Sequence, residues 1–500
     1  MPEELDQDLL SIQEARNLAR QAQVAQEAFV HFNQYQIDLI CASMAEAAYE
    51  QAERLARMAV EETHMGVVEH KTIKNQFASK NVWMSIKDVR TEGVIRRDEV
   101  NKIIEIAWPF GVIAAMIPTT NPTSTVIFKS LISVKARNAI VVLPHPSAPK
   151  CTAEAVRVVA EAAEAAGAPK GLITCMTHIS MEGTSELLKQ KEVKLIIATG
   201  GESMVTYAHS VGKPALGVGP GNVPLYVDRS ADVEKAARDI VNSVNFDYGV
   251  ICAHEGAIIA DKPIADQLVK ELEKNGAYFL SPEQADKLGK AMFRPNGLMQ
   301  PNFVGRSPQV LAEQAGFTVP DEARILVARM TDVGPKVPLS REKLAPIVGF
   351  YVEDGWHSGC ARCIEMLEFG GKGHTMGLHC TDEDVIMQFG LQKPAFRIIV
   401  NSSTTAGAIG YSTGLAPSLT LATGGMGGGI SSDNITVHHL FNVKRVAYEL
   451  RPFSPPVVYD RKTAAPSPTL NAPASGPKMS SSEVEEMVRR VIREELARKS

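Results

Sequence analysis

The 500-residue sequence lacks several features that would place it in a specialised class of protein. Its seven cysteines are widely scattered, so they do not form the disulfide framework of a small secreted domain. Its net charge is only -5, which gives no electrostatic reason to expect nucleic-acid binding. Its histidines show no metal-ligand spacing, and no metal site is predicted.

The sequence also has no segment that suits a membrane span or a signal peptide. The uncharged run from Ile106 to Phe128 is long enough, but it contains three prolines and Asn121. The acidic N-terminus has no apolar signal segment. We therefore expect a cytoplasmic protein with no membrane contact. Its length and its 45% hydrophobic content suit two or three globular domains.

The periodicity of the apolar residues predicts an α/β architecture. Proline and glycine are absent between Pro2 and Gly66, which favours two or three long helices there. Residues 88–108 resemble two antiparallel strands. From residue 111 onward, short apolar runs alternate with helical patterns, and the alternation repeats from Val223 to about Asn401. Such alternation predicts parallel sheets with helices on both faces, a usual home of dinucleotide sites.

The composition changes sharply after Arg451. Residues 452–481 are rich in proline, serine and alanine, so they are predicted to form a linker. Residues 482–499 return to a helical pattern with a single apolar face. An eighteen-residue helix is marginally stable alone, so we expect it to fold by docking against a partner.

Cys252 is the candidate nucleophile. A polar, glycine-containing stretch at 245–252 leads to it, and the apolar run 257–260 that follows is typical of a buried strand. A cysteine at such a corner can project its sulfur into a cleft while rigid backbone holds it. The alternative is that Cys252 is a small core residue.

Other candidates follow predicted strands. Asn121 could donate a hydrogen bond to an oxyanion or form an Asn-Pro turn. Residues 199–203 (TGGES) could bind a phosphate or serve as a simple strand-to-helix turn. His145 could contact an adenine or ribose or stiffen a turn, and Glu342 could bind a ribose or lie exposed. The pair Cys360 and Cys363 falls on a predicted helix, with no second pair to complete a zinc site.

Together these motifs resemble the aldehyde dehydrogenase superfamily, and most closely its CoA-acylating branch in bifunctional aldehyde/alcohol dehydrogenases and in bacterial-microcompartment propionaldehyde and acetaldehyde dehydrogenases. The resemblance covers about residues 10–450. The matching segments are 118–122 (PTTNP), 144–146 (PHP), 198–201 (ATGG), 217–222 (GVGPGN), 246–253 (FDYGVICA), 342–346 (EKLAP), 373–375 (GHT) and 415–420 (LAPSLT).

The resemblance implies two Rossmann-like parallel-sheet domains and a small β oligomerisation flap. The expected cofactor-binding domain is 1–225 and the catalytic domain is 226–430. The flap would combine the 88–108 hairpin with strands in 431–451. The implied catalytic residues are Cys252 and Asn121. The implied contacts to NAD and coenzyme A are Thr119, His145, Pro146, Thr199, Gly200, Gly201, Gly219 and Glu342.

Two departures from the family pattern indicate which reaction to expect. Hydrolytic members place a general-base glutamate where Val218 stands here, and no acidic residue lies between Glu202 and Asp228. Without a base to activate water, an acyl thioester formed on Cys252 is expected to react with CoA and not with water. Hydrolytic members also hold the adenosine ribose with a lysine near residue 144, where this sequence has Pro144, His145 and Pro146. This difference favours an adenine site that NAD and CoA occupy in turn.

The sequence therefore predicts a CoA-acylating aldehyde dehydrogenase that uses NAD and CoA. Propionaldehyde is the favoured substrate, with acetaldehyde as another possibility. The resemblance also implies a homo-oligomer (dimer or tetramer) and an encapsulation peptide at 482–499 that directs the enzyme into a microcompartment. The alternatives are an NAD-dependent enzyme that releases the free acid and a non-catalytic scaffold. The choice between NAD and NADP, and a role for His374 in the substrate pocket, are left open.

Overall fold

The computed structural model describes residues 6–453, except for the side chain of Glu202. The predicted helix at 482–499 and residues 454–481 of the predicted linker lie outside the described residues. Residues up to Ala447 belong to one compact unit. Within the described part of the chain, no helix has the length and apolar character needed to cross a membrane.

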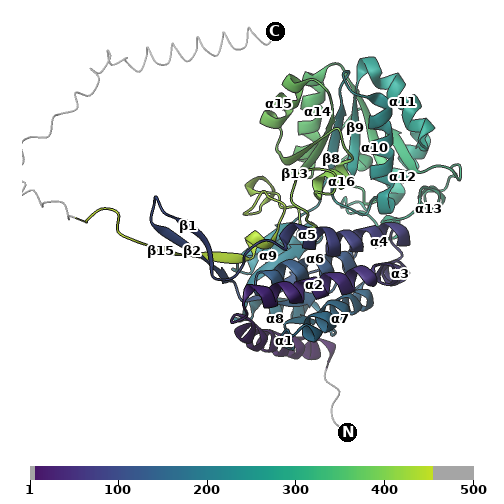
Figure 1. Cartoon of the computed structure of the whole chain (residues 1–500). Coiled ribbons are helices and arrows are strands. Elements are labelled where there is room, and N and C mark those ends of the chain that lie inside the picture. Colours follow the sequence, from purple (N-terminus) through teal and green to yellow (C-terminus); the bar gives the residue numbers. More distant parts are fainter. Residues whose placement is uncertain (1–5, 454–500) are drawn as a thin grey trace, which may run out of the picture. The chain divides into compact units, whose positions relative to one another are not determined.

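Long helices form the N-terminal region, as the absence of proline and glycine predicts. They are α1 (Gln7–Phe29), α2 (Gln34–Glu50) and α3 (Ala52–Thr63). Asn33 begins α2 with a capping box, in which its side chain accepts from the Gln36 N–H. The next helix, α4 (Val68–Gln76), continues directly into a π-helical turn at Phe77–Asn81. Helix α1 packs against α8 (Met181–Lys189), and α2 packs against α7 (Pro149–Ala165), as Figure 1 shows.

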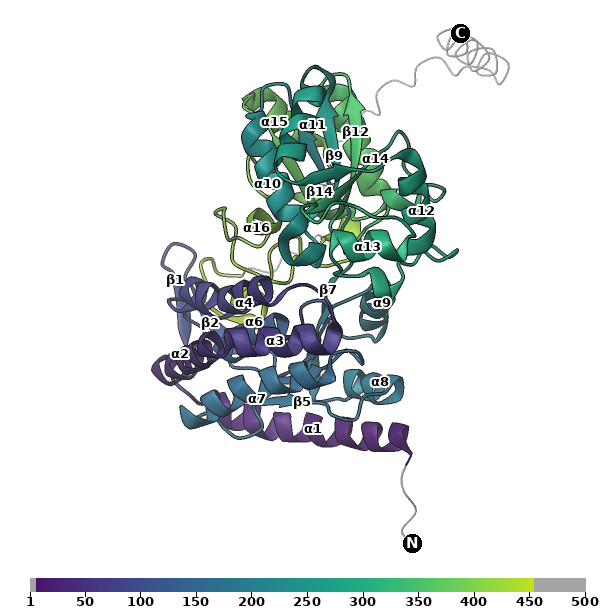
Figure 2. The same cartoon turned by 90° about the vertical axis from the view of Figure 1, so that its right-hand side faces the viewer.

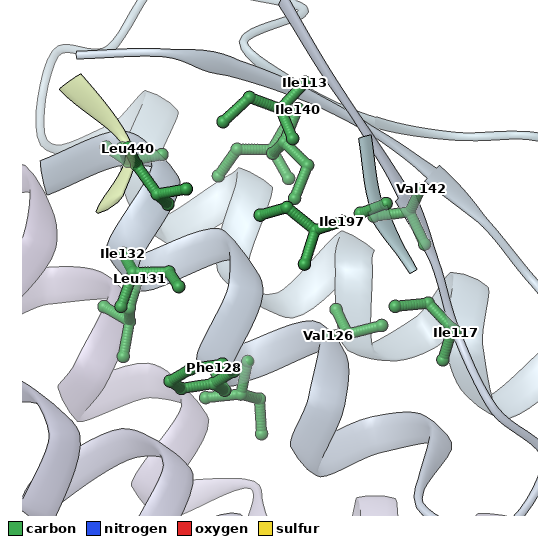
Figure 3. Close-up of a cluster of buried hydrophobic side chains, with 14 of the residues drawn as sticks. Ile113, Ile117, Val126, Phe128, Leu131, Ile132, Ile140, Val142, Ile197 and Leu440 are labelled. Atoms are coloured by element: carbon green, nitrogen blue, oxygen red, sulfur yellow. The ribbon is translucent and has the colours of Figure 1, made fainter. Parts of the chain in front are cut away.

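The first parallel sheet has five strands in the order β5-β4-β3-β6-β7. Its strands are β3 (Val112–Met116), β4 (Ala139–Leu143), β5 (Ile173–Cys175), β6 (Val193–Thr199) and β7 (Ala215–Val218). The helices between them are α6 (Pro122–Lys135), α7 (Pro149–Ala165), α8 (Met181–Lys189) and α9 (Glu202–Ser210). Strand β3 lies in the centre and is fully buried. Figure 3 shows the core beside it, where Phe128 and Leu131 of α6 lie near Ile140 and Ile197 of the strands.

The second parallel sheet has seven strands in the order β10-β11-β12-β9-β8-β13-β14. Its strands are β8 (Val223–Val227), β9 (Glu255–Asp261), β10 (Ala277–Phe279), β11 (Ile325–Arg329), β12 (Ile347–Glu353), β13 (Gly373–His379) and β14 (Ala395–Val400). The main helices beside it are α10 (Val233–Asn245), α11 (Ala265–Lys274), α14 (Trp356–Phe369) and α15 (Glu383–Gln392), which surround the sheet in both views (Figures 1 and 2).

Strand alternation explains why this sheet needs helices on both faces. Leu225 of β8 and Ile258 of β9 join the core under α10 and α11. Their neighbours Tyr226 and Ile259 point the opposite way, into the core under α14 and α15. Strands β8 and β9 are therefore apolar on both sides in their central residues, as the continuous apolar runs predict. The two parallel sheets confirm the predicted α/β class.

The third sheet is small and antiparallel, with the order β1-β2-β15. The predicted 88–108 hairpin consists of β1 (Val94–Asp98) and β2 (Ile103–Pro109). Strand β15 (Phe441–Ala447) pairs with the whole of β2. Figure 1 shows these three strands side by side. Their role in oligomer formation stays a prediction.

The remaining helices are short. They include α5 (Val82–Ile86), α12 (Pro282–Met292), α13 (Pro308–Gln314) and α16 (Thr404–Ala408). The predicted Cys360–Cys363 pair lies buried on α14. Among the described residues, no group of three or more metal-binding side chains comes together.

Candidate active site

One pocket brings together almost all of the predicted site residues. It has a volume of about 220 Å³ and lies where loops of the five-stranded sheet meet the turn that precedes β9. The predicted residues that line it are Cys252, Asn121, Thr119, His145, Thr199, Gly200, Gly201, Gly219 and Glu342. Pro146 is exposed and lies outside the lining.

The first wall of the pocket is built from the carboxyl ends of parallel strands. Residues 118–121 follow β3, His145 follows β4, and residues 200–201 follow β6 before α9 begins. These strands are neighbours in the sheet, so their loops meet at one edge. This is the position at which open α/β sheets bind nucleotides.

The polar groups of this wall suit a nucleotide cofactor. The hydroxyls of Thr119 and Thr199 are buried and have no hydrogen-bond partner within the protein. A buried hydroxyl without a partner is costly, and a bound ligand would satisfy it. Gly200, Gly201 and Gly219 have open space where a side chain would otherwise stand. The backbone at the start of α9 can therefore be approached closely by a phosphate.

The second wall carries Cys252, in the turn between the buried Ile251 and strand β9. The cysteine is partly exposed, and its side chain packs against the core of the first sheet. Burial raises the pKa of the thiol to about 12, and the nearby charge of Glu342 adds to this rise. The thiol is therefore held largely protonated until a positive charge, a base or a bound ligand shifts its pKa.

The turn before Cys252 has an unusual backbone. Asp247 and Tyr248 have φ angles of 53° and 50°, and Gly249 follows with a φ of 73°. A left-handed conformation costs a residue with a side chain roughly 1–2 kcal/mol. At Gly249 the space is also closed, because a Cβ atom would lie 2.6 Å from the Ala345 carbonyl oxygen. Contacts elsewhere must hold this turn in place.

The carboxylate of Asp247 provides those contacts from a fully buried position. It accepts hydrogen bonds from the Val67 N–H at 2.8 Å, Lys71 Nζ at 2.9 Å and Lys74 Nζ at 2.6 Å. The Asp247 N–H in turn donates to His70 Nδ1 at 2.8 Å. All these partners come from α4 and the residue before it, so the N-terminal helices fix the turn that carries Cys252.

Asn121 lies between the two walls. It precedes α6, yet its side chain makes no capping hydrogen bond. Its Oδ1 accepts from Lys74 Nζ at 2.7 Å. Its Nδ2 donates to the Val250 carbonyl at 3.1 Å and to Thr120 Oγ1 at 3.3 Å. The amide is therefore held at its oxygen by a short charged contact and at its NH₂ group by one ordinary hydrogen bond and one longer contact.

Glu342 differs from the exposed loop carboxylate that was one interpretation of the sequence. It lines the pocket, and its Oε1 accepts from the Gly221 N–H at 2.8 Å. Burial raises the pKa of this carboxyl to about 8. Among the lining residues that the structure describes, it is the one carboxylate, and Val218 is a buried apolar side chain of the lining.

His374 is fully buried and does not belong to the pocket lining. Its Nδ1 lies 3.0 Å from Thr375 Oγ1, while its Nε2 has no partner. Burial, together with the charge of Arg397, lowers its pKa to about 3, so the ring is neutral. Gly221 separates this region from Cys252, since a Cβ atom there would lie 2.0 Å from the Cys252 carbonyl oxygen.

Sequence reasoning missed two features of the site. One is the buried ion pair of Lys74, which lines the pocket, and Asp247, which lies behind it; the aspartate was noted only as part of a motif. The other is an apolar patch of the lining, formed by Ile409, Leu419 and Leu421, of which Leu419 was noted only as part of a motif. The lysines at positions 71 and 74 have helical spacing, but nothing local in the sequence indicates that both point at one carboxylate.

Comparison with known proteins shows which family the chain is similar to. Residues 8–279 match the model of the aldehyde dehydrogenase family. The aldehyde-alcohol dehydrogenase 2 of Entamoeba histolytica is 42% identical over 88% of this chain and 52% of its own length. The acetylating succinate-semialdehyde dehydrogenase of Clostridium kluyveri is 34% identical over 87% of this chain and 95% of its own. The chain thus spans about half the length of the aldehyde-alcohol dehydrogenases that it matches.

Solved structures resemble the chain over most of its length. The acetylating aldehyde dehydrogenase of Geobacillus thermoglucosidasius has 53% identity and a TM-score of 0.89, over 90% of this chain and 99% of that one. The propionaldehyde dehydrogenase of Rhodopseudomonas palustris, solved with bound CoA and an acylated cysteine, has 29% identity and a TM-score of 0.80, over 87% and 97%. The propionaldehyde dehydrogenase of a Clostridium phytofermentans microcompartment has 27% identity and a TM-score of 0.79, also over 87% and 97%.

Proposed function

The chain belongs to the aldehyde dehydrogenase family, and we propose that it is a CoA-acylating aldehyde dehydrogenase with Cys252 as its nucleophile. It converts a short-chain aldehyde, a nicotinamide cofactor and CoA to acyl-CoA and the reduced cofactor. One observation carries the proposal: Cys252 and Asn121 share a pocket with the strand-end loops, and the apolar Val218 lies where hydrolytic members place a base.

The residues of the pocket divide the work between chemistry and binding. The Cys252 thiolate attacks the aldehyde carbonyl, and the carbonyl oxygen becomes an oxyanion. The Asn121 NH₂ group donates to that oxyanion. When bound, the nicotinamide cofactor accepts the hydride, and CoA supplies the thiol that takes the acyl group from Cys252. Thr119, Thr199 and the backbone at 200–201 would hold these cofactors.

Transfer of the acyl group to CoA is favoured over hydrolysis because the pocket has few groups that could take a proton from an attacking water molecule. Val218 has no proton-accepting group, and one oxygen of Glu342 is engaged by the Gly221 N–H. A thioester on Cys252 therefore persists until a stronger nucleophile arrives. The thiol of CoA meets that requirement.

The lining also favours an uncharged, apolar aldehyde. Ile409, Leu419 and Leu421 form its apolar patch. The lysine of the lining, Lys74, has three acceptors for its three N–H groups and is not free to bind an anionic substrate. Propionaldehyde is the favoured substrate and acetaldehyde is next.

A single assay tests the proposal against both alternatives. Aldehyde and cofactor are mixed with the protein, with and without CoA, and reduced cofactor, acyl-CoA and free acid are measured. We expect sustained reduction of the cofactor only with CoA, and acyl-CoA as the product. Equal rates without CoA, with free acid released, would establish the hydrolytic alternative. No reduction with any of a panel of aldehydes would favour the scaffold. NAD and NADP are run in parallel.

The same assay tests the expectation that NAD and CoA use one adenine site in turn. The proposal rests on His145, which lies in the same pocket lining as Thr199, Gly200 and Gly201. CoA should then compete with NAD for the free enzyme, and the kinetics should be ping-pong. A complex with both cofactors fully bound at once would contradict this.

The C-terminal segment is proposed to direct the enzyme to a protein shell. The support is the single apolar face of residues 482–499 and the likeness to a microcompartment enzyme. The helix would dock on shell or core proteins, and the oligomer would form through the three-stranded sheet. Residues 479–500 fused to a fluorescent protein should localise to shells, and deletion of 455–500 should leave activity intact. Diffuse fluorescence or lost activity would contradict the targeting role.

A further inference from the structure

We propose that Lys74 is a positioning residue that orients the Asn121 amide, so that its NH₂ group faces the oxyanion formed at Cys252. This inference rests on the proposed function, since it assigns a role in the same reaction. Lys74 belongs to α4, far from both residues in the sequence, and it reaches the pocket as a buried side chain.

The argument begins with the donor geometry of the lysine. The ammonium group of Lys74 has three N–H donors and no acceptor. Its three partners are Asn121 Oδ1 at 2.7 Å, Asp247 Oδ2 at 2.6 Å and the Val250 carbonyl at 2.8 Å. Because an ammonium can only donate, the oxygen of the Asn121 amide must face it. The NH₂ group must then face away from the lysine.

Lys74 is the one hydrogen-bond partner of the amide oxygen among the described residues. The Asn121 side chain does not cap α6, and its Nδ2 donates to the Val250 carbonyl at 3.1 Å and to Thr120 Oγ1 at 3.3 Å. Without Lys74 the orientation of the amide rests on these two contacts alone, so the amide rotates more readily and can present its oxygen to the oxyanion. Two oxygens facing each other would repel, so the donor that stabilises the reaction would be lost.

The charge of Lys74 is secured by its surroundings. Burial lowers the pKa of Lys74 to about 8, while the charge of Asp247 acts in the opposite direction. The charges of Lys71 and Lys74 in turn hold the pKa of Asp247 below its usual range, against the effect of burial. The network therefore keeps an ammonium beside Asn121 at neutral pH.

Lys71 supplies a matched control on the same helix. It lies one helical turn before Lys74, is equally buried, and donates to the same Asp247 oxygen at 2.9 Å. Its other contact is the Thr120 carbonyl at 2.8 Å, and no bond joins it to Asn121. Loss of Lys71 therefore weakens the ion network without releasing the amide.

The experiment is a double-mutant cycle with Lys74→Met and Asn121→Ala, measured on the full chain with NAD and CoA. The wild type must first form acyl-CoA, which tests the proposed function separately. Each single variant should lower kcat by roughly 10²-fold, the usual cost of one oxyanion donor. The kcat of the double variant should be no more than about threefold below that of Asn121→Ala, because the two single changes remove the same interaction. The aldehyde KM should stay within about threefold.

The controls separate orientation from general stability. Lys71→Met should lower Tm about as much as Lys74→Met but should reduce kcat by less than about tenfold. Losses that multiply in the double variant, or a Lys71→Met defect in kcat as large as that of Lys74→Met, would overturn the inference. So would an unchanged kcat in Lys74→Met.

A second variant keeps the inference testable if Lys74→Met fails to fold. Asn121→Asp retains an oxygen for Lys74 but has no NH₂ group to donate. Its kcat should fall at least as far as that of Asn121→Ala, while its Tm should be equal to or above that of Asn121→Ala, because the new carboxylate pairs with the ammonium. A Tm below that of Asn121→Ala would show that no such contact exists and would overturn the inference.

Discussion

The two walls of the pocket are built in different ways. One wall consists of loops at the carboxyl ends of β3, β4 and β6, whose glycines and threonines have open space or free hydroxyls. The other is the turn before β9, at the amino end of its strand, with left-handed residues anchored by buried ions. The first wall follows a general rule of parallel sheets, whereas the second depends on contacts from helices far away in the chain.

The difference shows how binding and chemistry make separate demands on structure. A cofactor site needs open backbone and unpaired polar groups, which strand ends provide readily. A nucleophile needs one fixed position, and here that position is held at the cost of backbone strain and buried charge. Changes in the first wall should therefore alter cofactor affinity, and changes in the second should alter rate or stability.

The largest expected effect comes from removal of the nucleophile in the second wall. Cys252→Ala should lower kcat by at least about 10⁴-fold, the scale of loss when an enzyme lacks its nucleophile. Because Cys252 lies outside the ion network, Tm should change little, and cofactor binding measured by calorimetry should persist. Retained activity in a folded Cys252→Ala protein would refute the mechanism.

The next effect concerns stability. Asp247→Asn leaves Lys71 and Lys74 buried without their counter-charge and should lower the free energy of unfolding by about 3–5 kcal/mol. Because the pKa of Asp247 is lowered in the folded protein, its contribution is present at neutral pH and is lost as the pH falls through that value. Denaturant unfolding at several pH values should show a weaker acid-side decline for the variant. Equal stability of the two proteins at pH 7 would show that the turn is held by other contacts.

Asn121 connects the two walls, and its replacement distinguishes rate from binding. Asn121→Ala should lower kcat by roughly 10²-fold, while the dissociation constant of NAD changes by less than about threefold. Steady-state kinetics combined with equilibrium cofactor binding provide the measurement. A loss of NAD binding with kcat preserved would place Asn121 in the cofactor wall instead.

The smallest expected effect is electrostatic and involves Glu342. Its negative charge raises the pKa of Cys252, so Glu342→Gln should lower that pKa and increase the thiolate fraction at a given pH. Alkylation by iodoacetamide at pH 9 should become a few-fold faster, because the pKa of Glu342 is about 8 and the carboxylate is ionised there. At pH 6, where the carboxyl is mostly protonated, the two proteins should react at similar rates.

The sequence indicated the first wall more completely than the second. Apolar runs and glycines predicted β3, β6 and their loops, and Asn121 and residues 199–201 were predicted to follow these strands; the structure brings them into one pocket. The ion network could not be predicted in this way, because Lys74 and Asp247 are separated by 173 residues and no local pattern relates them. Glu342 illustrates the same limit, since its Oε1 accepts a hydrogen bond from the N–H of Gly221, 121 residues away in the chain.

The pairing of β15 with β2 has a consequence for how the polypeptide matures during synthesis. Pro109 emerges from the ribosome long before Phe441, the residue that pairs with it. At roughly 5–20 residues per second, the open edge of β2 waits on the order of tens of seconds for its partner. Throughout that interval a strand rich in isoleucine presents unpaired N–H and C=O groups to other nascent chains. Neighbouring ribosomes on one message could therefore bring two such edges together, and chains that stop short of residue 441 should aggregate more readily than the complete chain.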